Sequence, residues 1–283
     1  MSEQNKNAGA PFLDVKDLVV EYYSDGKVIH AVNGVNLTLE RGKTLGLVGE
    51  TGAGKTTIAK SILRILPDVG AKVAGGTITL DGQDITFQPD YRRSKVIGRM
   101  FQDPLKGTAP HMTIEENLAL AFLRASRQTS PFSRITKADR TFFAGKLSAL
   151  GLGLEDRMKQ PVGLLSGGQR QALTLLMATL VTPKLLLLDE HTAALDPATA
   201  DKVLELTRQI VAENRITCLM ITHNMRDALT LGNRTLMMDR GRIVLDVGGE
   251  ERAHMGVNEL LERFAANAGH ALDNDRILLS NEE

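Results

Sequence analysis

The sequence predicts an α/β fold in which helices cover both faces of a mainly parallel sheet. Two observations predict this class. From about residue 166 onward, segments with helical spacing alternate with short apolar segments, as in a parallel sheet with crossover helices. Near residue 50, a glycine-rich segment follows a short apolar strand and precedes a helical segment, which is the arrangement of a phosphate-binding loop.

The N-terminal part predicts a smaller, antiparallel β subdomain. Residues 1–10 are polar, and we expect a flexible leader there. Apolar and polar residues then partly alternate in two segments, which is typical of half-buried antiparallel strands. A helical segment after the glycine loop ends at Pro67, which cannot continue a helix. The elements expected in this part are strands 14–23, 35–39, 44–48 and 77–80 and a helix at 56–66.

The remaining segments divide the chain into a main domain at 11–246 and a C-terminal helix and tail at 247–283. Within the main domain, residues from about 103 to 165 are mostly helical, which predicts an inserted helical subdomain. Its clearest helices are 114–127 and 138–150, separated by the polar linker Gln128–Ser133. The elements expected after it are helices 166–181, 198–213 and 225–231 and strands 185–188, 216–221, 234–238 and 242–246.

Composition excludes several classes of protein. Lys and Arg together number 34, as do Asp and Glu, so the chain lacks the basic footprint of a nucleic-acid binder. No segment approaches the ~20 apolar residues that span a bilayer, and the first ten residues lack an apolar signal-peptide core. The single cysteine, Cys218, cannot form a disulfide within the chain and reads as a buried thiol in a reduced, cytoplasmic setting.

The glycine loop matches the pattern G-x-x-x-x-G-K-[ST] and predicts a P-loop NTPase (RecA-like) core. Its glycines let the backbone wrap an anion, and the helix N-terminus presents amide donors to phosphate. Lys55 is expected to reach the β- and γ-phosphates, and the Thr56 hydroxyl to bind Mg²⁺. The loop alone also fits a GTPase or a small-molecule kinase, although a guanine-reading N-K-x-D motif is absent. The residues expected at the nucleotide triphosphate are Gly49, Glu50, Thr51, Gly52, Ala53, Gly54, Lys55, Thr56 and Thr57.

Two acidic residues follow the apolar strand 185–188. Parallel strands present their carboxyl ends at the ligand-binding edge of a sheet, so Asp189 is expected beside the phosphate loop, where it would bind Mg²⁺ through water. Glu190 points elsewhere and is the candidate general base that deprotonates the attacking water.

The segment Leu165–Gln171 reads LSGGQRQ, and with it the chain resembles an ABC transporter nucleotide-binding subunit over roughly residues 12–246. Ser166 is placed to cap a helix whose first amides Gly167 and Gly168 expose, which makes a second anion site. One compact subunit cannot hold one γ-phosphate at both sites. The resemblance implies a head-to-tail dimer, homo- or heteromeric, in which Ser166, Gly167, Gly168 and Gln169 close over the partner's ATP.

The resemblance assigns further roles. Gln102 matches the glutamine that senses Mg²⁺ and water, and His223 matches the histidine at the γ-phosphate. Asp196 matches the loop that crosses the dimer interface. Tyr22, or alternatively Tyr23, matches the aromatic residue that stacks on adenine. The sites implied are catalytic Glu190, His223 and Gln102, and for Mg²⁺ Thr56, Gln102 and Asp189.

One position departs from the family pattern. His191 stands where the family usually has proline, and we expect it, like the other unassigned histidines, to be a surface or structural residue. The departure leaves both acidic residues, Asp189 and Glu190, in place, so we expect hydrolysis to be retained.

The resemblance also implies partners and location. Residues 12 to about 80 resemble dipeptide and oligopeptide import ATPases, whereas Phe101–Thr113, Asp189–Thr192 and Thr222–Asp246 resemble ATPases paired with tryptophan-type substrate-binding proteins. Expected partners are membrane permease subunits and a substrate-binding protein, with the chain peripheral at the cytoplasmic face. The alternatives are a soluble ABC ATPase without a transport role and a regulatory subunit that does not hydrolyse ATP. Soluble ABC ATPases usually carry two ATPase cassettes in one chain or a long coiled-coil insertion, and the sequence contains neither.

Overall fold

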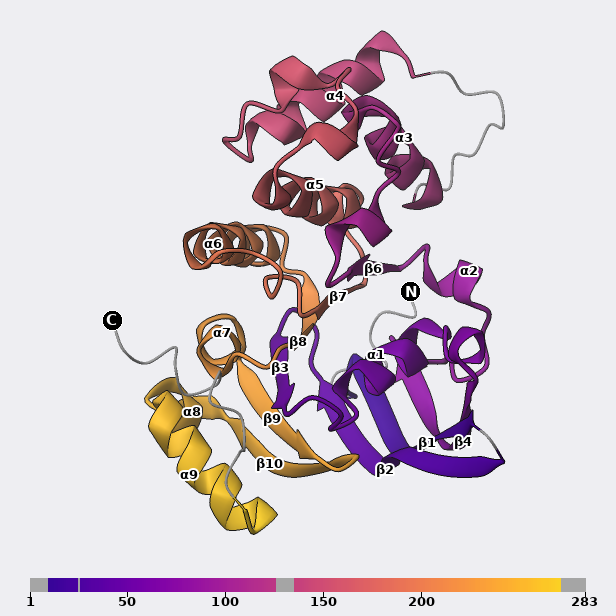
Figure 1. The fold of residues 1–283 in the computed structure, drawn as a ribbon, viewed down its shortest axis with the longest axis vertical. Coiled ribbons are helices and arrows are strands. Elements are labelled where there is room, and N and C mark those ends of the chain that lie inside the picture. The colour runs from indigo at the N-terminus through magenta and orange to yellow at the C-terminus, as the bar shows by residue number, and fades with distance from the viewer. Residues whose placement is uncertain (1–9, 25, 126–134, 271–283) are drawn as a thin grey trace, which may run out of the picture. The chain divides into compact units, whose positions relative to one another are not determined.

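The computed structural model leaves some of the sequence predictions outside its range. The linker expected at Gln128–Ser133, the polar tail after residue 270 and nearly all of the leader expected at 1–10 lie outside the described residues. The residues that the structure describes are 10–24, 26–125 and 135–270 (Figure 1).

The chain folds as two compact units, and each is described by itself. The first unit is discontinuous in sequence and comprises 1–93 and 217–283. The second unit is the continuous segment 94–216. No helix in the described part of either unit is both long enough and apolar enough to cross a membrane.

The first unit contains an antiparallel sheet with the strand order β2-β1-β4-β5. Strand β1 (Leu13–Ser24) is central and pairs with β2 (Lys27–Leu39) and β4 (Ala71–Leu80), and β5 (Gln83–Asp84) extends the edge. The predicted antiparallel subdomain is therefore confirmed. The sequence predicted a strand from Val35, whereas strand β2 begins at Lys27. The prediction missed this first part because its first residues are exposed and show no alternation of buried and exposed positions.

A second sheet in this unit carries the glycine loop. Its strands run in the order β10-β9-β3-β8, with β3 parallel to both of its neighbours. Every residue of β3 and β8 is buried, which explains their continuous apolar sequences. Helix α1 (Lys55–Leu63) packs on β2 and β3, and α7 (Met225–Leu231) packs on β3. The strands are β3 (Thr44–Gly49), β8 (Thr217–Ile221), β9 (Arg234–Asp239) and β10 (Arg242–Gly248).

The described part of the first unit also contains helices α2, α8 and α9. Helices α8 (Gly249–Ala253) and α9 (Val257–Ala268) pack against β10 (Figure 1). The short helix α2 (Asp90–Arg93) ends in Arg93, whose side chain is only 1% exposed. Its guanidinium donates hydrogen bonds to the carbonyls of Ser61 and Ile62 at the end of α1. Arg93 therefore anchors the helix that begins at the glycine loop.

The second unit combines a parallel strand pair with a helical subdomain. Strand β6 (Ile97–Met100) pairs with β7 (Leu185–Asp189) in parallel register. Strand β6 is absent from the sequence prediction. The predicted helices are confirmed. The apolar faces of the helices at 114–125, 137–148 and 167–179 meet in one core that includes the buried Phe143 and Leu173. The helices are α3 (Ile114–Ala125), α4 (Lys137–Ser148), α5 (Gly167–Thr179) and α6 (Pro197–Glu213).

The thiol of Cys218 provides a test of the first unit's core. Cys218 lies in β8 with no exposed surface, and burial raises the pKa of its thiol because the thiolate would lose hydration. We expect labelling by an aromatic disulfide reagent to be at least ~100-fold slower in the native protein than in denaturant. Absorbance of the released thiolate measures this rate. Rapid labelling of the native protein would show that β8 is not closed as described.

Candidate functional site

The glycine loop takes a backbone path that few residues other than glycine tolerate. Gly49, Gly52 and Gly54 have φ values of 151°, 87° and 102°, in the region that L-residues with a side chain rarely adopt. A Cβ atom at Gly49 would lie 2.4 Å from the carbonyl oxygen of Met238, and one at Gly54 would lie 2.6 Å from that of Ala31. The loop is therefore held against β9 and β2. Gly49 and Gly54 are required by both conformation and space, and Gly52 by conformation alone.

Helix α1 begins directly after the glycine loop, so its N-terminus lies at the loop. Gly54 is the N-cap residue and has no side chain to cap the helix. The amides of the first turn of a helix carry a partial positive charge that suits an anion. The side chain of Lys55 is 4% exposed and folds back over the loop. Its Nζ atom donates to the carbonyls of Gly49 and Glu50 at 2.7 and 2.8 Å.

The structure separates the two tyrosines that the sequence left as alternatives. The hydroxyl of Tyr22 lies 3.4 Å from Oγ1 of Thr57, in the first turn of α1. Tyr23, its neighbour on β1, points elsewhere: its hydroxyl bonds to Glu21, and Lys72 lies 4.5 Å from its ring centroid. Tyr22 is therefore the tyrosine at the start of α1.

His223 lies at the same edge of the sheet as the glycine loop. Strands β3 and β8 are parallel and pair Leu47 with Ile221, so Gly49 and His223 each lie two residues beyond that pair. The amide of Thr222 still donates to the carbonyl of Leu47, at 3.2 Å. His223 thus stands at the carboxyl end of a strand next to the loop, as the sequence predicted.

In the second unit, β6 and β7 bring together Gln102, Asp189 and Glu190. Asp189 is 6% exposed at the end of β7, and the guanidinium of Arg99 on β6 lies 3.9 Å from its Oδ2 atom. Nε2 of Gln102 donates to Oε2 of Glu190 at 3.2 Å. Burial lowers the pKa of Arg99 and the Asp189 charge opposes this. Sequence reasoning missed Arg99 because it missed β6.

The LSGGQ segment forms a capped helix start, as predicted. The hydroxyl of Ser166 accepts from the amide of Gln169 at 3.3 Å, and Oε1 of Gln169 accepts from the amide of Ser166 at 3.2 Å. A Cβ atom at Gly168 would lie 2.3 Å from Cγ2 of Thr199, so the helix start approaches the first turn of α6 closely.

Asp196 caps the helix that the LSGGQ segment approaches. Its carboxylate accepts from the amide of Thr199 at 3.1 Å, at the N-terminus of α6. Hydrogen bonds from Thr199 lower the pKa of Asp196, so the residue is an anion near neutral pH. Within its own subunit Asp196 therefore has a structural partner. Its predicted role at a dimer interface stays a prediction.

His191 is buried, although it directly follows a partly exposed carboxylate. Its side chain is 3% exposed, and burial lowers its pKa to about 4. Its Nε2 atom lies 3.4 Å from Oγ1 of Thr207 on α6. Gln171 on α5 donates from Nε2 to the His191 carbonyl. Of the two roles expected for His191, surface or structural, the structure supports the structural one.

The donor set suits Mg²⁺ better than a transition metal. In the described part of the chain, no group of three or more His, Cys, Asp or Glu residues could hold a metal ion. Mg²⁺ bound with a nucleotide needs only one or two protein oxygen ligands, because phosphates and water complete its shell. The predicted set of Thr56, Gln102 and Asp189 offers a hydroxyl, an amide and a carboxylate, which are hard oxygen donors.

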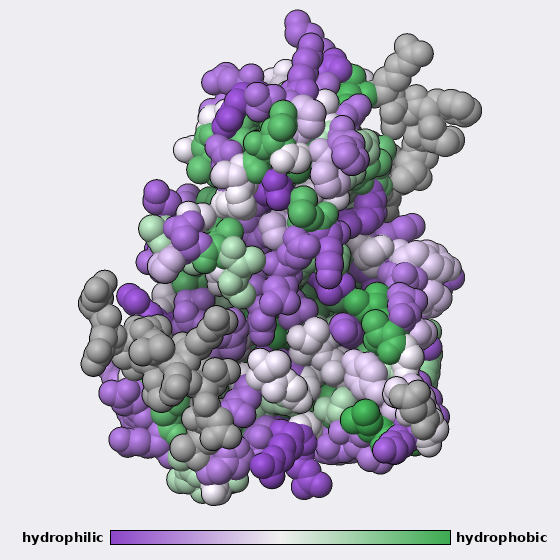
Figure 2. Space-filling model, in the orientation of Figure 1, coloured by the Kyte–Doolittle hydropathy of each residue, from purple (hydrophilic) through white to green (hydrophobic). Residues whose placement is uncertain are grey.

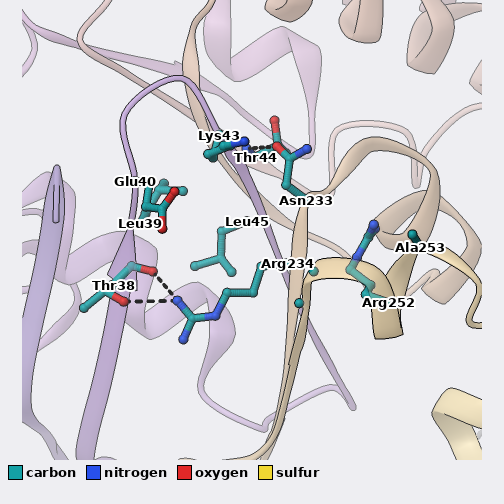
Figure 3. Close-up of a pocket in the computed structure, with 12 residues that line it drawn as sticks. Thr38, Leu39, Glu40, Lys43, Thr44, Leu45, Asn233, Arg234, Arg252 and Ala253 are labelled. Atoms are coloured by element: carbon teal, nitrogen blue, oxygen red, sulfur yellow. Dashed lines mark hydrogen bonds between the residues drawn. The ribbon is translucent and has the colours of Figure 1, made fainter. Parts of the chain in front are cut away.

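One pocket of the first unit, with a volume of about 470 Å³, lies away from the glycine loop. It opens at the N-terminal end of β3, beside Thr44, whereas the loop follows the carboxyl end of that strand (Figure 3). The two arginines that line it have partners. Arg234 pairs with Asp246, and Arg252 donates to the carbonyls of Ala228 and Leu229 at the end of α7. The pocket is therefore separate from the predicted nucleotide site.

Sequence comparisons relate the chain to ATP-binding proteins of transport systems. The sequence profile of the family described as ABC transporter matches residues 32–193. The tyrosine transport ATP-binding protein of Clostridioides difficile is 40% identical over 81% of this chain and 89% of its own. The dipeptide transport ATP-binding protein DppD of Bacillus subtilis is 32% identical over 82% of this chain and 69% of its own.

Solved structures agree with the fold. A dimeric bacterial ABC transporter cassette superposes with a TM-score of 0.70 at 25% identity, covering 83% of this chain and 98% of that one. A second cassette, from Clostridium perfringens and part of an ABC transporter complex, has a TM-score of 0.71 at 23% identity, covering 92% of this chain and 97% of that one.

Proposed function

Because this chain belongs to the ABC transporter family, as an ATP-binding and ATP-hydrolysing subunit, we propose that it powers the import of a small solute through separate membrane subunits. The observation that carries the proposal is the 40% identity to a tyrosine transport ATP-binding protein. The identity to the dipeptide transport protein is lower, at 32%. These values support an amino acid, rather than a peptide, as the class of solute.

We propose the following roles for the first unit. The backbone amides of Gly49–Thr56 bind the phosphates, and Lys55 moves its ammonium group from the loop carbonyls to the β- and γ-phosphates. Tyr22 stacks on the adenine, since it stands at the first turn of α1. His223 contacts the γ-phosphate and orients the attacking water.

In the second unit, Glu190 is the proposed general base. Its carboxylate takes a proton from the attacking water, and Gln102 orients that carboxylate through their hydrogen bond. Mg²⁺, when bound with ATP, neutralises charge on the phosphates, and Thr56, Gln102 and Asp189 would hold it. Arg99 places its positive charge beside Asp189, with the guanidinium 3.9 Å from Oδ2.

We further propose that the working enzyme is a head-to-tail dimer. The helix start capped by Ser166 offers a second anion site on each chain, and the related bacterial cassette is dimeric. In the dimer, Ser166, Gly167, Gly168 and Gln169 close over the ATP of the partner, and Asp196 lies at the interface. Permease subunits and a substrate-binding protein complete the importer, which places the chain at the cytoplasmic face of the membrane.

Replacement of the loop lysine tests this function. Lys55→Ala removes the cation that reaches the phosphates, and we expect ATP affinity to fall at least ~10-fold and hydrolysis to fall with it. Fluorescent-nucleotide titration measures binding. Uptake of labelled tyrosine and of a labelled dipeptide, in cells that lack the native gene, measures transport.

The matched control is Lys60→Ala, in the last turn of the same helix, which should leave both readouts near wild type. Unchanged ATP affinity in Lys55→Ala would remove the loop assignment. If Lys55→Ala restored uptake as fully as the wild-type chain, transport would not depend on ATP binding by this chain, and the proposed transport role would be wrong.

A further inference from the structure

We propose that His191 is a positioning residue that holds the backbone at Glu190 and so fixes the direction of its carboxylate. The proposal rests on the function of Glu190 proposed above. It concerns a residue that touches neither nucleotide nor water and that acts through its neighbour. Three observations carry it: the backbone conformation of Glu190, the burial of the His191 ring, and the bond to the His191 carbonyl.

The backbone of Glu190 is in an unfavourable conformation. Its φ is +48°, in the left-handed region that a residue with a long side chain adopts only when its surroundings hold it there. The turn is tight, because the Glu190 carbonyl accepts from the amide of Ala193 at 3.1 Å. Left to its own preference, Glu190 would return to an extended conformation, and its carboxylate would move away from Gln102.

The ring of His191 fastens the next residue to α6. It is 3% exposed, and its Nε2 atom faces Oγ1 of Thr207, which has no exposed surface. The Thr207 hydroxyl donates its proton to the carbonyl of Val203 at 2.7 Å. It therefore accepts from His191, whose Nε2 atom must carry the proton. The ring is neutral in this setting, since burial disfavours its charged form.

The main chain of His191 is fastened to α5 as well. Gln171 is 1% exposed and donates from Nε2 to the His191 carbonyl. Its Oε1 atom is buried without a hydrogen-bond partner in the described structure, so this donation is what orients the amide. The residue after Glu190 is thus held by its side chain on α6 and by its carbonyl on α5, the helix that Ser166 caps.

A general base depends strongly on this kind of fixation. Displacement of a reacting group by about 1 Å can cost ~10²-fold in rate, even when the change is made outside the chemical groups. Glu190 itself is only half-buried, so packing of its own side chain contributes little to its direction. Its backbone, held through His191, acts together with the hydrogen bond from Gln102 in fixing the direction of the carboxylate.

The test compares two substitutions at position 191. His191→Ala empties the buried site, and we expect kcat for ATP hydrolysis to fall at least tenfold per ATP-binding site while KM for ATP stays within about twofold. His191→Gln places an amide donor near the position of Nε2, and it should recover at least half of the lost kcat. The number of sites is counted by nucleotide titration, so that misfolded protein does not enter kcat.

A double variant separates positioning from plain stability. In a Glu190→Gln background, His191→Ala should cause no further loss in single-turnover rate, because the residue through which it acts is already gone. The control is Val211→Ala, one turn from Thr207 on the buried face of α6. It should lower the unfolding temperature and leave kcat per site unchanged.

The outcomes distinguish this inference from the proposed function. A normal kcat in His191→Ala, or a loss that persists in the Glu190→Gln background, overturns the positioning role. Near-normal turnover in Glu190→Gln alone would instead overturn the proposed general base, and with it the premise.

Discussion

Glu190→Gln is expected to bind ATP normally and to lose hydrolysis by a factor of ~10²–10⁴, the usual contribution of a general base. This corresponds to about 3–5 kcal/mol of transition-state stabilisation. The substituted amide keeps the size and shape of the side chain, and its oxygen can still accept from Nε2 of Gln102. What it lacks is a basic oxygen that can take a proton from water.

Three measurements check this expectation together. Steady-state phosphate release gives the loss in rate, and nucleotide titration shows whether affinity is kept. Size-exclusion chromatography with ATP should show an accumulated dimer, since the state before hydrolysis no longer decays. Glu205→Gln is the matched control, because Glu205 is exposed on α6 and only pairs with Arg208. If Glu190→Gln turned over ATP at nearly the wild-type rate, another group would have to be the base.

The parts of the site that sequence predicts well are those fixed by local backbone chemistry. The glycines at 49, 52 and 54 reveal the loop because few other residues tolerate its φ values or its close contacts. Ser166 and Gln169 reveal a helix start because a capping box has a fixed three-residue spacing. Their conformations follow from a few neighbouring residues, so one sequence is enough to predict them.

The parts that sequence reasoning missed depend on contacts far along the chain. Strand β6 is four residues long and contains Gly98 and Arg99, so it lacks the apolar run of a buried strand. Arg93 stands in the charged segment Tyr91–Lys95, which reads as solvated surface. It is buried because carbonyls at the end of α1, about 30 residues earlier, accept its hydrogen bonds. The sequence left His191 as a surface or structural residue, and its burial likewise depends on a contact with Thr207, on the helix that follows it.

Family membership and transport specificity were predicted to different depths. The loop, the LSGGQ segment and the two acids established the ATPase, and the comparisons confirm that it belongs to an ABC transporter. The relatives include a tyrosine transport and a dipeptide transport ATP-binding protein, which match 81% and 82% of this chain, so neither corresponds to one half of it. In the proposed importer the solute contacts other subunits, so the residues of this chain determine its identity only indirectly.

The second large effect is expected for Ser166→Arg. A cationic, bulky side chain replaces the helix cap, removes the hydroxyl that accepts from Gln169, and blocks approach of a partner's ATP. We expect hydrolysis to fall at least ~10²-fold. An isolated subunit should still bind ATP as before, because its glycine loop belongs to the first compact unit and Ser166 to the second. Ser148→Arg, at the exposed end of α4, is the control for an added arginine.

Mixing two inactive variants tests the head-to-tail site directly. A Ser166→Arg subunit has an intact loop, and a Lys55→Ala subunit has an intact LSGGQ segment. In a homodimer that pairs one with the other, one composite site contains both intact parts. Random pairing should then recover about a quarter of wild-type activity if the sites act independently. Should the chain pair with a sibling ATPase, the two substitutions are placed on opposite subunits. A mixture as inactive as its components would mean that loop and LSGGQ segment do not meet across a dimer.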